Sequence, residues 1–391
     1  MKTNRDIDIV VYGATGFTGR LVAEYLNQTY GVDGDVKWAM AGRSIDKLIA
    51  IRDELGIAKN VPLIVANADD LDSINNMVNK TSVVLTTVGP YQLYGNELVA
   101  ACAASGTDYV DLCGEPAWMH QMIAEHSAAA QESGARIVFS CGFDSIPFDL
   151  GVLFLQQHAE LELGSTVSRV KGRVRAMKGT MSGGTLASFR ETMAAAGRDK
   201  NLISVLRNPF SLTSGFQGAD QPLGNKPEYD EAIESWIAPF VMASINTKNV
   251  HRSNMLLDHH YGEDFVYDEM MVTGPGEKGE AIAKAVTEDN SMAKSTLQPG
   301  EGPTKEEREN GFYDVLMVGE HLDGRSVRIS VKGDRDPGYG STSKMIAESA
   351  VCLVKNPQLA SGGIWTTAPA MGAELIDRLQ ANAGLTFTIE S

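Results

Sequence analysis

The sequence predicts an α/β protein with a doubly wound parallel sheet followed by a second α+β domain that has a mainly antiparallel sheet. Up to Pro147, short β-branched runs alternate with helical segments across glycine-bearing turns, which is typical of parallel strands joined by right-handed crossovers. After Pro147, apolar and polar residues alternate as in half-exposed strands. The 391 residues also exceed the size at which single cores stop growing, so we expect two domains.

The first domain is predicted as a regular series of strands and helices. The strands are expected at 8–12, 36–41, 61–66, 82–88, 108–112 and 135–141. The helices are expected at 19–28, 46–55, 71–79, 95–105 and 117–133. Each strand is short and apolar, as expected for a sheet that is covered on both faces.

The second domain begins with residues 165–176, whose alternation predicts an antiparallel strand. Asp323-Gly324 is a hairpin signal between two strand-like runs. The other expected features are a helix over 184–196, an irregular stretch over 208–228, the hairpin strands 312–319 and 326–332, a polar surface loop over 296–310, and a helix that starts at Ser341 and ends before Pro357.

Composition narrows the range of partners. The net charge of −16 excludes a nucleic-acid partner and argues against docking on anionic lipid, because both need basic clusters. The polar residues 1–8 pass directly into the first strand, so we expect no secretory signal, and no apolar run predicts an integral membrane segment. The cysteines show no CxxC pair and the histidines no metal-ligand spacing, so we expect a reduced, cytoplasmic protein with no metal.

The stretch "VVYGATGFTGRLVAEYL" places three evenly spaced glycines between a strand and a helix. Such glycines allow a tight turn and let the backbone approach a pyrophosphate, which is met by free N–H groups at the positive end of the helix. A tight turn without a ligand is the alternative, but the strand–turn–helix context favours dinucleotide binding. The residues expected to bind it here are Gly13, Thr15, Gly16, Phe17, Thr18 and Gly19.

The end of the second predicted strand indicates which dinucleotide is bound. NAD sites usually carry an acidic residue there, whereas this chain has Arg43 and Ser44. The arginine fork suits a 2′-phosphate, so the sequence favours NADP(H). Alternatively, Arg43 pairs with Asp46. Asp69 lies after the third strand, where it either meets the adenine edge or caps a helix.

Three glycine- or proline-bearing segments follow later strands, at 85–95, 110–116 and 140–151. Ligands of open α/β sheets lie at the carboxyl ends of the strands, so these segments predict the mouth of the site. Gly89 and Pro90 are expected under the nicotinamide, with Thr86 or Thr87 near its ribose; ordinary turn chemistry explains them equally well. The cofactor residues expected in this segment are Thr87, Val88, Gly89 and Pro90.

A series of further motifs runs along the chain: "GATGFTGR", "AGRS", "TTVGPYQLYG", "YVDLCGE", "CGFDSIPFDLG", "MSGGTLAS", "PGEGPTKEERENG", "KGDRDPGYGSTSKMIAESA" and "GGIWTTAPAMG". In sequence and order these motifs resemble those of the saccharopine dehydrogenase-like oxidoreductases, a group that includes the mycobacterial trans-acting enoyl reductases. The resemblance implies an NADP-binding Rossmann domain over 1–147, a substrate or dimerisation domain over 148–335, and a C-terminal helical segment over 336–391 that returns to the first domain.

Enoyl reduction requires a proton donor for the α-carbon after hydride reaches the β-carbon. Tyr91 is the first candidate, followed by Asp144, Ser145 and Cys113. The Tyr-x-x-x-Lys pair of short-chain dehydrogenases does not occur at Tyr91. Tyr339 either reaches the cleft from the second domain or anchors its loop.

The main functional hypothesis is NADPH-dependent reduction of a C=C bond in an enoyl, lipid-type thioester. One alternative is a saccharopine- or opine-type C=N oxidoreductase, whose carboxylate substrates call for an arginine cluster. Arg169, Arg173 and Arg175 share one strand face, but a solvated face explains them at least as well. A further alternative is a non-catalytic NADP-binding, lipid-associated protein. Fold analogy suggests a homodimer that pairs through the second sheet.

Overall fold

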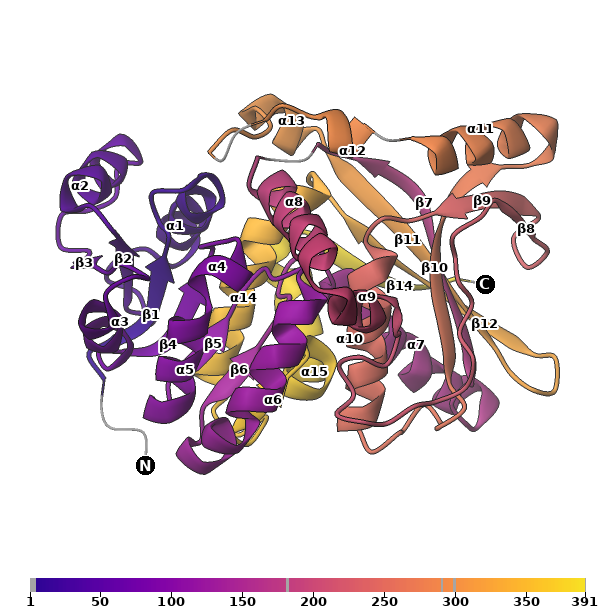
Figure 1. Cartoon of the computed structure of the whole chain (residues 1–391), viewed down its shortest axis with the longest axis horizontal. Coiled ribbons are helices and arrows are strands. Elements are labelled where there is room, and N and C mark those ends of the chain that lie inside the picture. Colours follow the sequence, from indigo (N-terminus) through magenta and orange to yellow (C-terminus); the bar gives the residue numbers. More distant parts are fainter. Residues whose placement is uncertain (1–4, 181–182, 290, 298–299, 391) are drawn as a thin grey trace.

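The protein contains two seven-stranded sheets that lie side by side (Figure 1). The computed structural model describes residues 5–180, 183–289, 291–297 and 300–390. The first sheet is entirely parallel, with strand order β13-β6-β5-β4-β1-β2-β3. The second is mixed, with order β14-β12-β11-β7-β10-β9-β8. The predicted fold class is confirmed.

The first sheet is covered by helices on both faces, which explains its continuous apolar strands. In β1, Ile9 and Val11 belong to one core, with α1 and α14, whereas Val10 and Tyr12 belong to a second core, with α3, α5 and α6. The strands of this sheet are β1 (Ile7–Tyr12), β2 (Trp38–Gly42), β3 (Leu63–Val65), β4 (Thr81–Thr86), β5 (Asp108–Val110), β6 (Arg136–Val138) and β13 (Gly363–Trp365). Its helices are α1 (Phe17–Tyr30), α2 (Ile45–Glu54), α3 (Leu71–Val78), α4 (Tyr91–Tyr94), α5 (Asn96–Ser105), α6 (Pro116–Ser133) and α14 (Thr342–Lys355).

The second sheet is built around β7, which pairs parallel with β10 and antiparallel with β11. The predicted antiparallel strand over 165–176 is therefore antiparallel on one side only. The strands are β7 (Arg169–Lys178), β8 (Glu228–Asp230), β9 (Ser235–Pro239), β10 (Val266–Gly274), β11 (Phe312–Glu320), β12 (Ser326–Gly333) and β14 (Leu385–Glu390). The remaining helices are α7 (Ile146–Leu163), α8 (Gly183–Arg198), α9 (Lys200–Arg207), α10 (Ala243–Leu256), α11 (Gly276–Glu288), α12 (Ser291–Lys294), α13 (Lys305–Glu309) and α15 (Thr367–Arg378), with π-helical turns η1 (Pro337–Ser341) and η2 (Leu379–Ala383).

The C-terminal segment serves both sheets. Helix α14 packs against α1 and β4, and β13 extends the first sheet by pairing with β6. The last strand, β14, instead pairs antiparallel with β12 at the edge of the second sheet. The segment expected to be helical thus contributes a strand to each sheet as well as two α-helices.

The arginine face of β7 is only partly exposed to solvent and is paired with acids, which corrects the interpretation of a solvated strand face. Arg173 is 2% exposed, and its guanidinium donates to Asp230 at 2.7 Å and to Asp268 at 2.8 Å. Arg175 pairs with Asp314 on the neighbouring strand β11 and with Glu390 at the end of the edge strand β14. Cross-strand acids neutralise the row because a buried guanidinium without a partner would be costly. These arginines are therefore engaged by the sheet itself.

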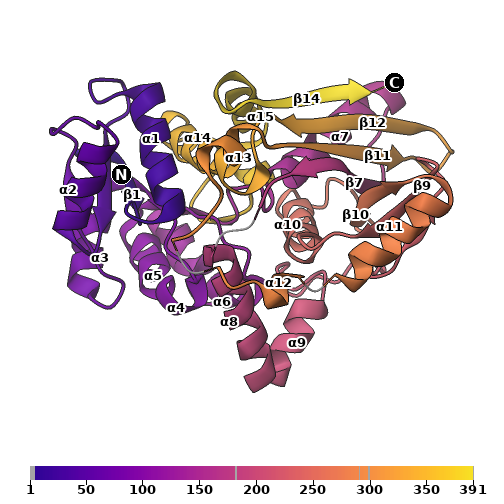
Figure 2. The same ribbon diagram turned by 90° about the horizontal axis from the view of Figure 1, so that it is seen from above.

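The predicted surface loop over 296–310 contains the short helix α13. Thr304 and Glu307 form a capping box at its start, which is why a polar, charged segment becomes helical. Helix α13 packs against η1, and Arg308 on α13 lies over the ring of Phe17 at the start of α1. Figure 2 shows the α8–α9 pair projecting from the body. Residues 298 and 299 of this segment, and residues 181 and 182 of the MSGGTLAS motif, lie outside the described residues.

Candidate functional site

The glycine turn between β1 and α1 requires a residue without a side chain at positions 13 and 19. Gly13 has a φ of +93°, and a Cβ there would lie 2.8 Å from Cγ2 of Val88 and 2.9 Å from Oγ1 of Thr87. A Cβ on Gly19 would lie 2.1 Å from the carbonyl oxygen of Gly13, so this glycine allows α1 to pack against the turn. Both glycines therefore have the roles expected in a dinucleotide-binding turn.

The start of α1 is open to an anion. Gly16 is the N-cap residue, is exposed and provides no side-chain cap, so no hydroxyl or carboxylate of its own blocks the first-turn N–H groups. Phe17 and Thr18 are the first two residues of the helix. Thr15 precedes the cap and lies near Gly42 at the end of β2. Free N–H groups at a helix N-terminus fit a pyrophosphate.

The ends of β1, β2 and β3 bring Tyr12, Arg43 and Asp69 close together. Burial raises the pKa of Tyr12 to about 12, Arg43 opposes this shift and Asp69 adds to it. Arg43 is exposed and forms no ion pair with Asp46, although both residues lie within the described chain. Ser44 instead caps α2 by accepting from the N–H of Lys47 at 3.4 Å. Arg43 is therefore available to a 2′-phosphate.

Asp69 is not the helix cap. The residue that follows it, Asp70, caps α3 by accepting from the N–H of Ser73 at 3.3 Å. Asp69 is itself exposed at the end of β3. Its carboxylate is free to meet the adenosine half of the cofactor.

The segment after β4 leads from the first sheet into the candidate site. Thr86 accepts from the N–H of Val88 at 3.2 Å, which turns the chain. The Thr87 hydroxyl oxygen is buried and has no hydrogen-bond partner within the described residues. Thr87 and Gly89 line a large cavity, and Pro90 leads into α4. An orphaned hydroxyl at this place fits the nicotinamide ribose or amide, because buried polar groups normally find a partner.

The cavity has a volume of about 540 Å³ and lies between the domain of the first sheet and that of the second. One wall comes from α1 and the segments after β4, β5 and β6, and the other from α8, α9, α10 and η1. Its lining is largely apolar, with small polar groups from Thr180, Thr185, Ser188, Thr192 and Ser244. Among the described lining residues, the only ionisable side chains apart from tyrosine are two acids, Glu115 and Asp144.

Tyr91 lines this cavity, but its phenol is engaged by backbone. The oxygen accepts from the N–H of Leu112 at 3.0 Å and donates to the carbonyl of Thr86 at 3.4 Å. The ring lies 5.6 Å from that of Trp118. Burial raises the pKa of Tyr91 well above its usual value, and Asp111 adds to the shift. The hydroxyl thus joins the ends of β4 and β5.

Asp144 differs from the other three catalytic candidates. Its half-buried carboxyl lines the cavity, burial raises its pKa to about 7, and it has no hydrogen bond to any described residue. Ser145 and Cys113 are buried outside the lining. Ser145 Oγ accepts from Asn249 Nδ2 at 2.7 Å, and Cys113 Sγ accepts from the N–H of Glu115 at 3.3 Å. The structure therefore brings Asp144 and Tyr91 to the cavity and directs the other two into the packing.

Two acidic residues of the site were missed by the sequence analysis. Glu115 accepts from the backbone N–H groups of Tyr91 and Gln92, each at 2.9 Å. Asp111 is fully buried and accepts from the N–H groups of Cys113 and Ser140 at 2.9 and 2.8 Å. Both lie in the segment 110–116, which the sequence places at the mouth of the site. The sequence showed that acids occur there, but not which way their side chains point.

Tyr339 both reaches the cavity and anchors its loop, the two roles expected from the sequence. It lines the cavity from η1, and its hydroxyl lies 2.9 Å from Oγ1 of Thr185 on α8. Its ring meets that of Phe17 edge-on at 5.2 Å. It therefore links the second domain to the start of α1.

A glycine turn on a parallel sheet, opening into a cavity shared with a second α/β domain, defines a two-domain NAD(P)-dependent oxidoreductase. Residues 9–138 match the saccharopine dehydrogenase NADP-binding domain family, in agreement with the NADP(H)-binding features of the turn. The chain is 38% identical over 408 aligned positions to a Mycobacterium tuberculosis protein that bears the name of a trans-acting enoyl reductase, covering 97% of this chain and 96% of the relative. It is 35% identical to the trans-acting enoyl reductase of Mycobacterium ulcerans, with the same coverage. The chain belongs to this family of saccharopine dehydrogenase-like oxidoreductases.

Solved structures show the same fold at low identity. Saccharopine dehydrogenase from Saccharomyces cerevisiae superposes with a TM-score of 0.55 at 9% identity, covering 98% of this chain and all of that one. Homospermidine synthase from Legionella pneumophila, solved with NAD, also gives 0.55 at 9% identity, covering 98% and 91%. Within the described residues, every helix is too short or too polar to cross a bilayer.

Proposed function

We propose that this protein reduces the C=C bond of an enoyl, lipid-type thioester. The observation that carries the proposal is the lining of the large cavity, where the described residues provide no lysine, arginine or histidine. A substrate of the saccharopine or opine type carries several carboxylates, which proteins normally grip with arginine. The arginines of β7 are committed to acids of their own sheet. A neutral acyl thioester suits this cavity better.

When bound at the glycine turn, NADPH would supply a hydride for the β-carbon of the substrate. The chain's own task is then to protonate the α-carbon, and Asp144 is the best placed group for it. A carboxyl with a pKa of about 7 keeps its proton near neutral pH and can still donate it. Tyr91 has both of its phenol contacts on backbone atoms, so we assign it the task of holding the segment at 85–95 against the end of β5.

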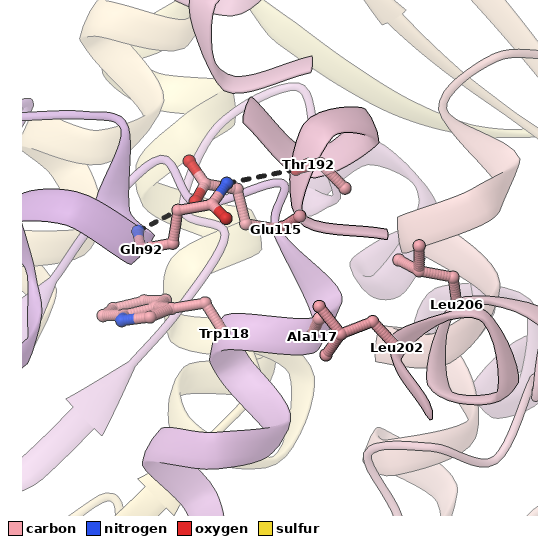
Figure 3. A pocket seen from close by; sticks show the side chains of 8 residues that line it. Gln92, Glu115, Ala117, Trp118, Thr192, Leu202 and Leu206 are labelled. Carbon is pink, nitrogen blue, oxygen red and sulfur yellow. Dashed lines mark hydrogen bonds between the residues drawn. The ribbon is translucent and has the colours of Figure 1, made fainter. Parts of the chain in front are cut away.

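The acyl tail has an apolar route away from the cofactor. A small cavity of about 20 Å³ lies between α6 and the α8–α9 pair and shares Glu115, Thr192 and Leu206 with the large one. Figure 3 shows Leu202 and Leu206 on one side of it, Trp118 and Ala117 on the other, and the Gln92–Thr192 hydrogen bond of 3.3 Å at its rim. A modest movement of α9, which buries none of its residues fully, would join the two cavities.

We also propose that the protein works in the cytoplasm as a homodimer. All four cysteines are free and buried, as expected in a reducing compartment. The second sheet ends in two edge strands, β8 and β14, and an unpaired edge can pair with a second copy. Light scattering during gel filtration measures the mass, and a single monomer peak would refute the dimer.

NADPH consumption, followed by absorbance, tests the function. Crotonyl and dodecenoyl thioesters are compared with a mixture of an oxoacid and lysine. We expect the enoyl thioesters to be reduced and the mixture to be inert. Oxidation of NADPH by the mixture alone would establish the C=N alternative. Tight NADPH binding without turnover of either class would establish a non-catalytic, NADP-binding protein, which flotation with lipid vesicles would then test for lipid association.

A further inference from the structure

The segment that precedes β11 leaves the second domain and lies on the glycine turn of the first. A Cβ on Gly302 would lie 2.6 Å from the ring of Phe17, so the backbone at 302 sits directly against that ring. The guanidinium carbon of Arg308 lies 5.7 Å from the centroid of the same ring. Phe17 is the first residue of α1, next to the exposed N-cap Gly16. Arg308 therefore stands beside the first residue of α1, at the helix end that is open to an anion.

The local structure holds Arg308 in this position. Its Nη1 donates to the carbonyl of Pro303 at 2.6 Å, and its own carbonyl accepts from the N–H of Asp336 at 3.0 Å. The capping box of Thr304 and Glu307 fixes the start of α13. These contacts orient the side chain before any ligand is bound, which lowers the entropic cost of a further contact.

The positive charge of Arg308 is not neutralised by a carboxylate within the described chain. It forms no ion pair with any described carboxylate. Burial raises the pKa of the Asp336 carboxyl and Arg308 opposes this rise, but the oxygens of Asp336 already accept from the N–H groups of Tyr339 and Gly340 at 3.0 and 2.6 Å. Arg20, a basic residue in the first turn of α1, pairs with Glu54 on α2. Arg308 is thus the available cation at a helix end that is built for an anion.

We infer that Arg308 binds the pyrophosphate of the dinucleotide from the second domain, so that the segment from 300 to 311 completes the cofactor site. The inference depends on NADP(H) binding and not on the enoyl substrate. Failure of the turnover assay would therefore leave it unaffected, and its own failure would leave the proposed reaction intact.

Binding measurements on the full-length protein test it without turnover. Nicotinamide fluorescence gives the Kd of NADPH and of NADH, and calorimetry gives that of adenosine 2′-monophosphate, which lacks the pyrophosphate. For Arg308→Ala we expect the Kd of both dinucleotides to rise by a similar factor, on the order of 10- to 100-fold. The mononucleotide should bind unchanged, and Arg308→Lys should recover part of the loss because it retains the charge.

The matched control is Arg325→Ala, which removes an arginine from the β11–β12 hairpin, where it pairs with Asp323. This variant should bind all three ligands as the parent does. Unchanged dinucleotide binding in Arg308→Ala would overturn the inference and reduce the arginine to a packing partner of Phe17. An equal loss for all three ligands would also overturn it, because the whole site would then have been disturbed.

Discussion

The buried carboxylate of Asp111 accepts a hydrogen bond from the backbone N–H of Ser140 at 2.8 Å, and this contact ties the end of β5 to the end of β6. The same carboxylate accepts from the N–H of Cys113 at 2.9 Å and from the hydroxyl of Tyr109 at 2.9 Å. The two joined segments carry Leu112 and Asp144 to the cavity. Asp111 thus positions the site without touching it.

Asp111→Ala should destabilise the protein by about 3 kcal/mol or more, because it leaves two buried N–H groups and a hydroxyl without an acceptor. Urea unfolding followed by circular dichroism measures the loss. Asp111→Asn keeps one oxygen acceptor and should lose distinctly less. Equal losses in the two variants would show that the hydrogen bonds to Asp111 are not what the fold depends on.

Asp144→Asn should lower kcat for enoyl reduction on the order of 10²- to 10⁴-fold, the usual effect of removing a proton donor. The Kd of NADPH should not change, because the residue lies beyond the cofactor turn. Tyr91→Phe provides the comparison, since it keeps the ring and removes the hydroxyl. Steady-state kinetics of the two variants decide whether Asp144 or Tyr91 is the proton donor. A larger kcat loss in Tyr91→Phe would assign this role to the tyrosine.

The pH dependence follows from the raised pKa of Asp144, about 7 against an ordinary value of 3.8. The carboxyl must be protonated to act, so kcat should fall as pH rises through about 7. A raised acid pKa also means that the folded state holds the proton more tightly than the unfolded one. Its contribution to stability is complete below the ordinary pKa and is lost as pH rises through about 7.

Asp144→Asn should remove that part of the pH dependence. Thermal unfolding from about pH 5 to about pH 8 is the measurement, with parent and variant compared at each pH. Asp111, whose pKa burial also raises to about 7, contributes in the same direction in both proteins, so only the difference between them reports on Asp144. If the unfolding temperatures of parent and variant changed with pH in parallel, the assignment of this pH dependence to Asp144 would be wrong.

Arg43→Ala should weaken the binding of NADPH by about tenfold or more and leave the binding of NADH unchanged. The reason is that the Arg43 side chain is exposed at the end of β2, where Rossmann domains bind the 2′-phosphate of NADP. Nicotinamide fluorescence titrations measure both. This pattern is the opposite of the one expected for Arg308→Ala, which should affect both dinucleotides alike. A uniform loss in Arg43→Ala would show that the residue does not read the 2′-phosphate.

Ala195→Phe should fill the small cavity between α6 and α8–α9. We expect dodecenoyl reduction to fall strongly while crotonyl reduction persists, because only the longer chain needs that space. Ala194→Phe is the matched control, one residue away on the exposed side of α8. A ratio of the two activities that stays constant in Ala195→Phe would place the acyl tail elsewhere.

The first domain could be predicted well because its signals are local. Its strands are apolar throughout, and its turns carry glycine, so each βα unit can be predicted from its own residues without those of its neighbours. Helix α10 was missed for the opposite reason. Its buried residues include Asn246, Asn249 and Arg252, so no apolar stripe marks the face that packs inward. Strands β13 and β14 were missed because partner strands far away in the sequence define them.

The sequence by itself determined the glycine turn, the cofactor class and the family, because these depend on residues within one or two βα units and on motifs in a fixed order. Only the tertiary structure placed Asp144 at the cavity and put Cys113 and Ser145 into the packing outside it. Side chains that are close in sequence point to different surroundings, and burial, which sets the pKa, is a property of those surroundings. The approach of Arg308 to Phe17 was likewise invisible, because it joins residues from two domains that meet only when the chain is folded.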